Sequence, residues 1–244
     1  MELNRYYWYN HNQLGSGYYY AGHLQDALKE FNEQVVENPS EDGGYLNIGS
    51  VYLQLGQWDK AIQYLQKALS IRPSVQAYSN LGTAYYDLGR YQDAIPMYQK
   101  ALALEPAHAA VMVNLAGAYA RTGQPEMASE TYNRAITLLY QQLDVNPQDS
   151  EKLGLLASCY AAQRHMERAR IFITRALKID PDDRELLYTK ATIDAIEGNV
   201  AQGLTDLRKA FENGYPFRVA MNDPDIARLR AAPGFKELRK KFGR

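Results

Sequence analysis

The side chains best suited to chemistry in this chain are its four histidines and its single cysteine. A nucleophilic enzyme needs a thiol beside a base, and a metal site needs several ligands that meet at one point. Cys159 and His165 form the one candidate nucleophile and base pair, but a thiol on a packed helix face is inert. His11, His23 and His108 lie far apart in the sequence. These residues therefore predict no catalytic group, no cofactor site and no metal site.

Other sequence signals of catalysis are also missing. The chain has no glycine-rich phosphate loop, no His-x-x-x-His or Cys-x-x-Cys metal pair, and no basic and aromatic strand pattern for RNA. Its glycines fall instead at regular intervals. We expect a protein that is not an enzyme and does not bind nucleic acid.

The elements that position these residues come from an internal repeat. A small-residue motif followed by tyrosine recurs five times, and successive tyrosines are 34, 33, 34 and 41 residues apart. A period near 34 is typical of stacked helix-turn-helix units. The copies are Leu14-Gly15-x-x-Tyr18, Ile48-Gly49-x-x-Tyr52, Leu81-Gly82-x-x-Tyr85, Leu115-Ala116-x-x-Tyr119 and Leu156-Ala157-x-x-Tyr160.

Each copy continues with the same second half. In the second copy this half reads Ala61, Leu65, Ala68 and Pro73. A proline ends the second helix because it cannot continue the hydrogen-bond ladder. A glycine such as Gly49 allows the two helices of a repeat to approach closely. The pattern resembles the tetratricopeptide repeat (TPR) family, whose signature has these residue types at these spacings.

The resemblance implies an all-α fold, a right-handed superhelical α-solenoid that forms one continuous array. A sixth copy is degenerate, because Lys190 and Asp194 replace leucine and tyrosine. We expect six repeats in residues 1–215 and capping helices in 216–244. The expected repeats span about 8–41, 42–74, 75–108, 109–149, 150–183 and 184–215.

Charge is balanced overall but uneven along the chain. The formal net charge of the 244 residues is −1, with −5 over residues 1–60 and +5 over residues 216–244. These ends are either solvated faces or surfaces for head-to-tail contact between copies. No signal peptide or membrane span is visible, and one cysteine excludes an intramolecular disulfide. We expect a cytoplasmic protein that does not bind membranes.

In the TPR family the first helix of each repeat lines a concave groove, and this resemblance names the candidate partner-binding residues. Tyrosine, serine, threonine and asparagine side chains suit a peptide backbone. No pair of basic residues is present to clamp a terminal carboxylate. The candidates are Tyr9, Asn12, Ser16, Tyr19, Tyr20, Leu46, Ser50, Leu53, Gln54, Ser79, Thr83, Tyr86, Asp87, Val113 and Arg121.

The first helix is unusually rich in aromatic residues. We expect Tyr18, with Tyr7 and Trp8, to pack within its own repeat. Tyr9, Tyr19 and Tyr20 remain as a patch for binding or self-association. The asparagines that recur just before the motif, at Asn47, Asn80 and Asn114, fit the family consensus and are interpreted as structural.

Two further segments depart from the period. The second helix of the fourth repeat is seven residues longer than its counterparts, close to two helical turns, and either covers its neighbours or offers an apolar ridge. Near the end, Phe235, Leu238 and Phe242 form one apolar stripe, which caps the last repeat or lies on a membrane. The sequence of this tail resembles bacterial TPR regions attached to signalling kinases and regulators, which indicates a bacterial source and a natural C-terminus.

The sequence thus predicts a scaffold that binds a peptide segment of a partner protein in a concave groove. Two alternatives remain. One is a scaffold that assembles with copies of itself through the aromatic first helix or the charged ends. The other is a regulatory TPR region of a larger signalling enzyme.

Overall fold

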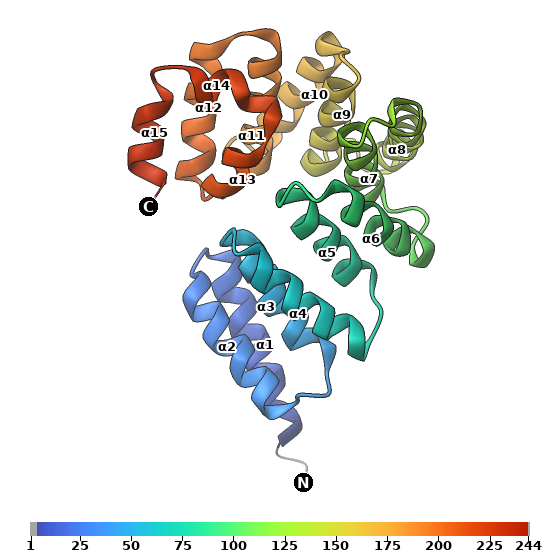
Figure 1. Cartoon of the computed structure of the whole chain (residues 1–244), viewed down its shortest axis with the longest axis vertical. Helices are drawn as coiled ribbons and strands as arrows, with labels where there is room; N and C mark the ends of the chain where they lie inside the picture. Colours follow the sequence, from blue (N-terminus) through green and yellow to red (C-terminus); the bar gives the residue numbers. More distant parts are fainter. Residues whose placement is uncertain (1–3, 244) are drawn as a thin grey trace. The chain divides into compact units, whose positions relative to one another are not determined.

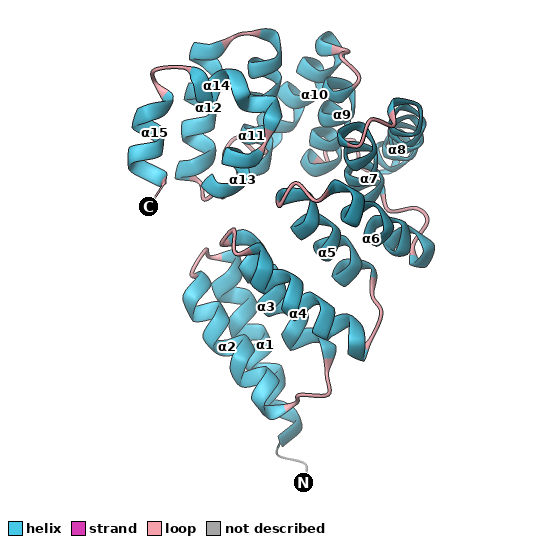
Figure 2. Ribbon diagram, viewed as in Figure 1, coloured by secondary structure: helices cyan, strands magenta, loops and turns pink. Residues whose placement is uncertain are grey.

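A computed structural model describes residues 4–243 of the chain, with side chains described from Tyr9 onward. Helices joined by short loops make up this part of the chain, and no strand occurs in it (Figure 2). None of its helices is long and apolar enough to cross a membrane. The chain divides into two compact units, Met1–Pro106 and Ala107–Arg244. The continuity of the array across this division stays a prediction.

Unit 1 consists of three consecutive helix pairs, drawn in blue to green (Figure 1). Within each pair the two helices pack side by side, and each second helix packs against the first helix of the next pair. The pairs are α1 (Asn4–Tyr20) with α2 (Leu24–Glu37), α3 (Asp42–Gln54) with α4 (Trp58–Ile71), and α5 (Val75–Asp87) with α6 (Tyr91–Leu104).

Unit 2 continues the same arrangement with three more pairs and then departs from it. The degenerate sixth copy forms a complete pair, α11 with α12. The pairs are α7 (Ala109–Arg121) with α8 (Pro125–Val145), α9 (Ser150–Ala162) with α10 (Met166–Ile179), and α11 (Arg184–Glu197) with α12 (Val200–Glu212). After them come α13 (Phe217–Asn222), the 3-10 turn η1 (Pro224–Ile226), α14 (Ala227–Ala231) and α15 (Phe235–Phe242). The all-α prediction is confirmed.

Local chemistry sets where these helices begin and end. The side chains of Ser74, Asp149 and Asp183 each accept a hydrogen bond from a backbone N–H three residues further on, and so cap α5, α9 and α11. The second helices of the first five repeats stop two residues before a proline, as α4 does at Ile71 before Pro73. The repeat boundaries therefore follow from capping and proline chemistry.

Close helix crossings explain the glycine of the motif. A Cβ atom built at Gly15 would lie 2.5 Å from Phe31, and one at Gly82 would lie 2.6 Å from Tyr98. Only hydrogen fits at these two positions, so the predicted crossing is confirmed. In the turn of the fifth repeat Arg164 takes the positive φ, 62°, that glycines supply in the other repeats.

The extended helix of the fourth repeat is α8, which has 21 residues where α4 and α6 have 14. Leu139 and Leu143 in its added part are buried, while Val145 at its end is 87% exposed. The hydroxyl groups of Tyr140 and Tyr160 lie 3.0 Å apart. The extension therefore covers its neighbour α9.

The tail after α12 closes the end of unit 2. Phe235 and Leu238 of α15 are buried in one apolar cluster with Leu207 and Phe211 of α12, and Phe242 packs against it. The stripe predicted from the sequence thus faces inward and caps the last pair.

The packing prediction for Tyr18 holds in part. Its ring contacts that of His23 in the same repeat, with centroids 6.3 Å apart, yet Tyr18 is 37% exposed, and Leu14 of the same motif is 52% exposed. The matching residues Ile48 and Leu81 are buried, because a preceding helix lies over them. The burial of this face depends on a neighbour outside its own repeat. Tyr7 and Trp8 lie outside the described side chains.

Candidate partner-binding surface

The first helices of unit 1 are linked by a row of amide and hydroxyl groups. Asn47 of α3 donates its amide hydrogen to the Oδ1 atom of Asn12 on α1, at 2.8 Å. Asn80 of α5 donates to the Oγ atom of Ser50 on α3, at 2.9 Å. The row therefore crosses both junctions between the three repeats of this unit.

Two further contacts, each within one repeat, hold Ser50 and Thr83 in place. Ser50 donates its hydroxyl hydrogen to the backbone carbonyl of Leu46, at 2.9 Å. The hydroxyl of Thr83 lies 3.3 Å from that of Tyr98, which is buried at the crossing of α5 and α6. These contacts fix the rotamers of Ser50 and Thr83 and leave both side chains half-buried.

The candidate residues of unit 1 differ in their exposure. Tyr9 is 51% exposed and Tyr20 is 86% exposed. Tyr19 packs against the apolar cluster of the first two repeats, and Tyr86 contacts the ring of Tyr91 with centroids 4.9 Å apart. The remaining candidates are half-buried: Asn12, Ser16, Leu46, Ser50, Leu53, Gln54, Ser79, Thr83 and Asp87.

The interpretation of Asn47 and Asn80 as structural agrees with these contacts. Each one bonds a residue of the preceding first helix, Asn12 or Ser50. Their signal was present in the sequence, since an asparagine precedes the motif in three consecutive copies. Side chains at the same position of successive stacked helices lie in a row.

In unit 2 the tail covers part of the corresponding surface. Arg121 of α7 donates to the Oδ2 atom of Asp225, at 2.5 Å, and lies 3.6 Å from Oδ1 of Asp223. Tyr188 of α11 is buried and donates its hydroxyl hydrogen to Asp223, at 2.7 Å. Its ring is stacked on that of Tyr215, with centroids 3.9 Å apart. The tail therefore folds over Tyr188.

Burial dominates the electrostatics of this contact. It raises the pKa of Tyr188 well above its usual value and raises the pKa of Asp223 as well, although the bond from Tyr188 opposes the second shift. Val113, the other unit 2 candidate, is half-buried on α7. The partner-binding roles of Val113 and Arg121 stay predictions.

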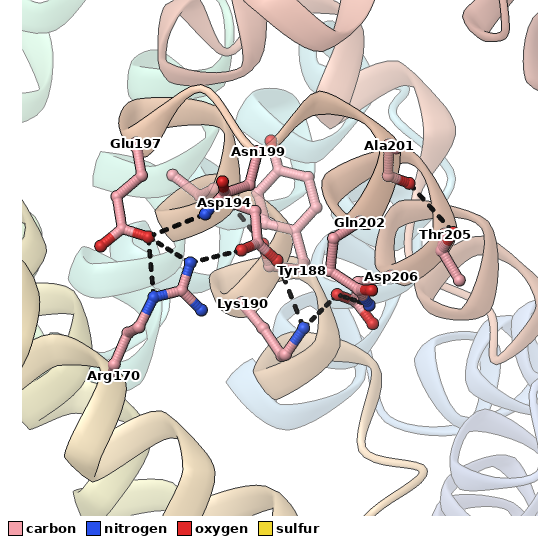
Figure 3. A network of polar contacts seen from close by, with 11 residues as sticks. Arg170, Tyr188, Lys190, Asp194, Glu197, Asn199, Ala201, Gln202, Thr205 and Asp206 are labelled. Carbon is pink, nitrogen blue, oxygen red and sulfur yellow. Dashed lines mark hydrogen bonds and ion pairs between the residues drawn. The ribbon is translucent and has the colours of Figure 1, made fainter.

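A second polar cluster lies between the fifth and sixth repeats (Figure 3). Arg170 of α10 donates to Asp194 at 2.7 Å and also binds Glu197. Lys190 lies between two buried carboxylates, binding Asp194 at 3.2 Å and Asp206. Each buried carboxylate of the cluster thus has a basic partner, and the bonds of Arg170 to α11 join the fifth repeat to the sixth.

The residues considered first for catalysis are not arranged for it. Cys159 is fully buried on α9, and this burial raises the pKa of its thiol to about 12. At neutral pH almost none of it is the nucleophilic thiolate. Among the described residues, no group of three or more His, Cys, Asp or Glu side chains is placed to hold a metal ion.

Comparison with protein families supports this interpretation of the repeats. Models described as tetratricopeptide repeat match residues 12–75, 44–107, 74–141 and 126–193. The human tetratricopeptide repeat protein 6 is 33% identical over 54 residues, which are 22% of this chain and 10% of that protein. The chain therefore corresponds to a small part of this relative.

Solved structures share the fold at low identity. The thermophilic TPR protein TTC0263 of Thermus thermophilus is 22% identical, with a TM-score of 0.61 over 76% of this chain and 98% of that one. The pilF protein of Pseudomonas aeruginosa is 18% identical, with a TM-score of 0.58 over 98% and 100%. The Cut9–Hcn1 hetero-tetramer of the APC/C is 16% identical, with a TM-score of 0.62 over 90% and 41%.

Repeats of this kind are typical of scaffolds for protein–protein interaction. The helix pairs, the crossing glycines, the proline stops and the matching family models all point to one assignment. This chain belongs to the tetratricopeptide-repeat family.

Proposed function

We propose that the chain binds a peptide segment of a partner protein along the first helices of unit 1, and that it acts by recognition without catalysis. The observation that carries this proposal is the row of Asn12, Asn47, Ser50, Asn80 and Thr83 across three consecutive first helices. These groups repeat at the spacing of the repeats. A bound segment would therefore be read at successive points along its length.

The chemistry of the row suits a peptide backbone. An asparagine amide has two donor hydrogens and an acceptor oxygen, so Asn47 and Asn80 have more bonding capacity than their cross-repeat bonds use. A peptide backbone presents N–H and C=O groups in alternation. The oxygen of an asparagine amide can accept from the N–H group while its NH₂ group donates to the C=O group. The contacts between the asparagines and their neighbours also reduce the rotamer freedom lost on binding.

The flanks of the row add surface for side chains of the ligand. The exposed rings of Tyr9 and Tyr20 and the half-buried Leu46 and Leu53 offer apolar contact area. Tyrosine supplies such area at low entropic cost. We therefore expect a ligand with apolar side chains and no need of a charged terminus.

A selection experiment tests the proposal directly. A library of random 12-residue peptides, displayed on phage, is selected against the intact chain, and the enriched peptides are titrated by fluorescence anisotropy. Asn80→Ala should weaken binding at least tenfold, about 1.4 kcal/mol. Gln63→Ala, on the exposed side of α4, is the matched control and should leave the affinity unchanged.

Thermal unfolding of both variants separates binding from stability. If Asn80→Ala keeps the melting temperature of the native chain and still binds every selected peptide with native affinity, the proposed surface is wrong.

A further inference from the structure

The outer face of α1 differs from the same face in later repeats. This face consists of Leu14, Gly17, Tyr18 and Ala21, in chain order, and all four residues are exposed. In α3 and α9 the first three positions are buried or half-buried. At the second position, the side chains of Val51, Ala84 and Cys159 are completely buried.

No described residue covers this face at Gly17. A Cβ atom built at Gly17 would meet no atom within 4 Å, whereas one at Gly15 on the opposite side would meet Phe31 at 2.5 Å. Two of the large exposed apolar side chains, Leu14 and Tyr18, lie on this face. An exposed group of this kind marks an interaction surface.

Other repeats of the chain show what kind of element fits this face. In α3 it is covered by α2, whose Leu24 and Leu28 lie in one apolar cluster with Ile48 and Val51. In α5 the hydroxyl of Tyr85, which corresponds to Tyr18, accepts a hydrogen bond from Gln66 of the preceding α4. The face is thus shaped to pack against another helix.

We propose that this face packs against the same face of a second copy of the chain, in a two-fold symmetric dimer with paired α1 helices. The axis passes near Gly17, where two backbones can approach because neither carries a side chain. Leu14 of each copy then lies beside Tyr18 and Ala21 of the other. A symmetric pairing of this kind closes on itself and forms no filament.

Charge and the opposite end of the chain favour this occupant. No acidic or basic side chain occurs from Asn12 to Gly22, so the face meets its own copy without repulsion between like charges. The apolar surface of the last helix pair is already covered, since Leu207 and Phe211 are buried under α15. That end therefore offers no apolar surface for head-to-tail stacking of copies, whereas the face of α1 remains accessible for pairing.

Light scattering after size exclusion, over a range of concentrations, tests the dimer. We expect a mass of twice 27.7 kDa at high concentration. The double variant Leu14→Glu/Tyr18→Glu should weaken association at least a hundredfold. A double variant at two exposed residues outside this face, Val36→Glu/Leu104→Glu, should leave it unchanged.

A cross-link identifies the face. Gly17→Cys should form an intermolecular disulfide on mild oxidation, because the axis brings the two copies together there, whereas Gln25→Cys on the exposed side of α2 should not. Cys159 is buried and does not compete. A monomer at every concentration would overturn the proposal, as would a dimer that keeps its affinity in the Leu14→Glu/Tyr18→Glu variant.

Discussion

Two glycines of α1 show how one residue type serves opposite purposes at a distance of two positions. Gly15 faces Phe31, and the helices of the first repeat cross there. Gly17 faces open space. The first glycine is required by packing, while the second lowers the stability of the helix, because glycine loses more backbone entropy than alanine on folding.

Alanine substitutions should therefore change stability in opposite directions. Gly15→Ala adds a methyl group against a buried ring, and overpacking costs about 1–3 kcal/mol, more than the gain in helix propensity of about 0.5–1 kcal/mol. Gly17→Ala should stabilise by about 0.5–1 kcal/mol. Urea unfolding at a concentration low enough for a monomer measures both. Equal effects of the two variants would contradict the assigned crossing.

Residue roles could be predicted from the sequence where the repeat itself determines them. Gly15 and Gly82 were placed correctly because their partners, Phe31 and Tyr98, lie within the same repeat. The exposure of Tyr18 and the burial of Tyr188 did not follow from the motif, because the burial of each depends on segments outside its repeat. A periodic pattern carries no information on such neighbours.

At the level of elements, the junction between the fifth and sixth repeats replaces an apolar contact by an ionic one. Positions that hold Leu156, Tyr160 and Phe172 in the fifth repeat hold Lys190, Asp194 and Asp206 in the sixth. On the preceding second helix, Arg170 stands where the second repeat has Ile62. The apparent decay of the sixth motif is thus a coordinated change of four residues that bind one another. The sequence alone showed only the two lost consensus residues.

The cluster predicts a large effect for one substitution. Lys190→Met leaves two buried carboxylates, Asp194 and Asp206, without their shared ammonium group, and should destabilise the chain by up to about 3–5 kcal/mol. Lys209→Met, at an exposed position of α12, should change stability by less than about 0.5 kcal/mol. Urea unfolding compares them.

A compensating variant separates charge burial from packing. The triple variant Lys190→Met/Asp194→Asn/Asp206→Asn should recover much of the stability lost in Lys190→Met, because the two amides have almost the volume of the carboxylates and leave no buried charge without its partner. Loss of stability in Lys190→Met no greater than in Lys209→Met would show that the charges around Lys190 do not stabilise the sixth repeat.

At the level of the whole molecule, the two ends of the chain have different surfaces. No described residue covers the outer face of α1 at Gly17, whereas the tail covers the last pair and reaches Arg121 of α7. Several basic side chains of the tail are held within the chain, including Lys241, which binds Glu212 at 2.7 Å, and Arg228, which binds the carbonyl of Ile196 at 3.1 Å. The positive charge seen in the sequence therefore serves partly to dock the cap.

The fold could be predicted from the sequence because each repeat contains the residues that determine its own helix pair. The tail could not be placed in detail, because it does not follow the repeat. Its contacts with Arg121 and Tyr188 join residues that are 104 and 35 positions apart, respectively. The same limit applies to the candidate surface. The row in unit 1 could be predicted because its asparagines occupy the same position in successive repeats. The contacts of the tail in unit 2 could not, because the tail is not part of the repeat.

The measurement that tests the central claim most directly is amide chemical-shift mapping of the intact chain with a selected peptide. We predict that the largest shifts fall on α1, α3 and α5, around Asn12, Asn47 and Asn80, with the exposed sides of α2 and α4 unchanged. Shifts confined to second helices or to unit 2, or no saturable shifts with any selected peptide, would contradict recognition along the first helices of unit 1.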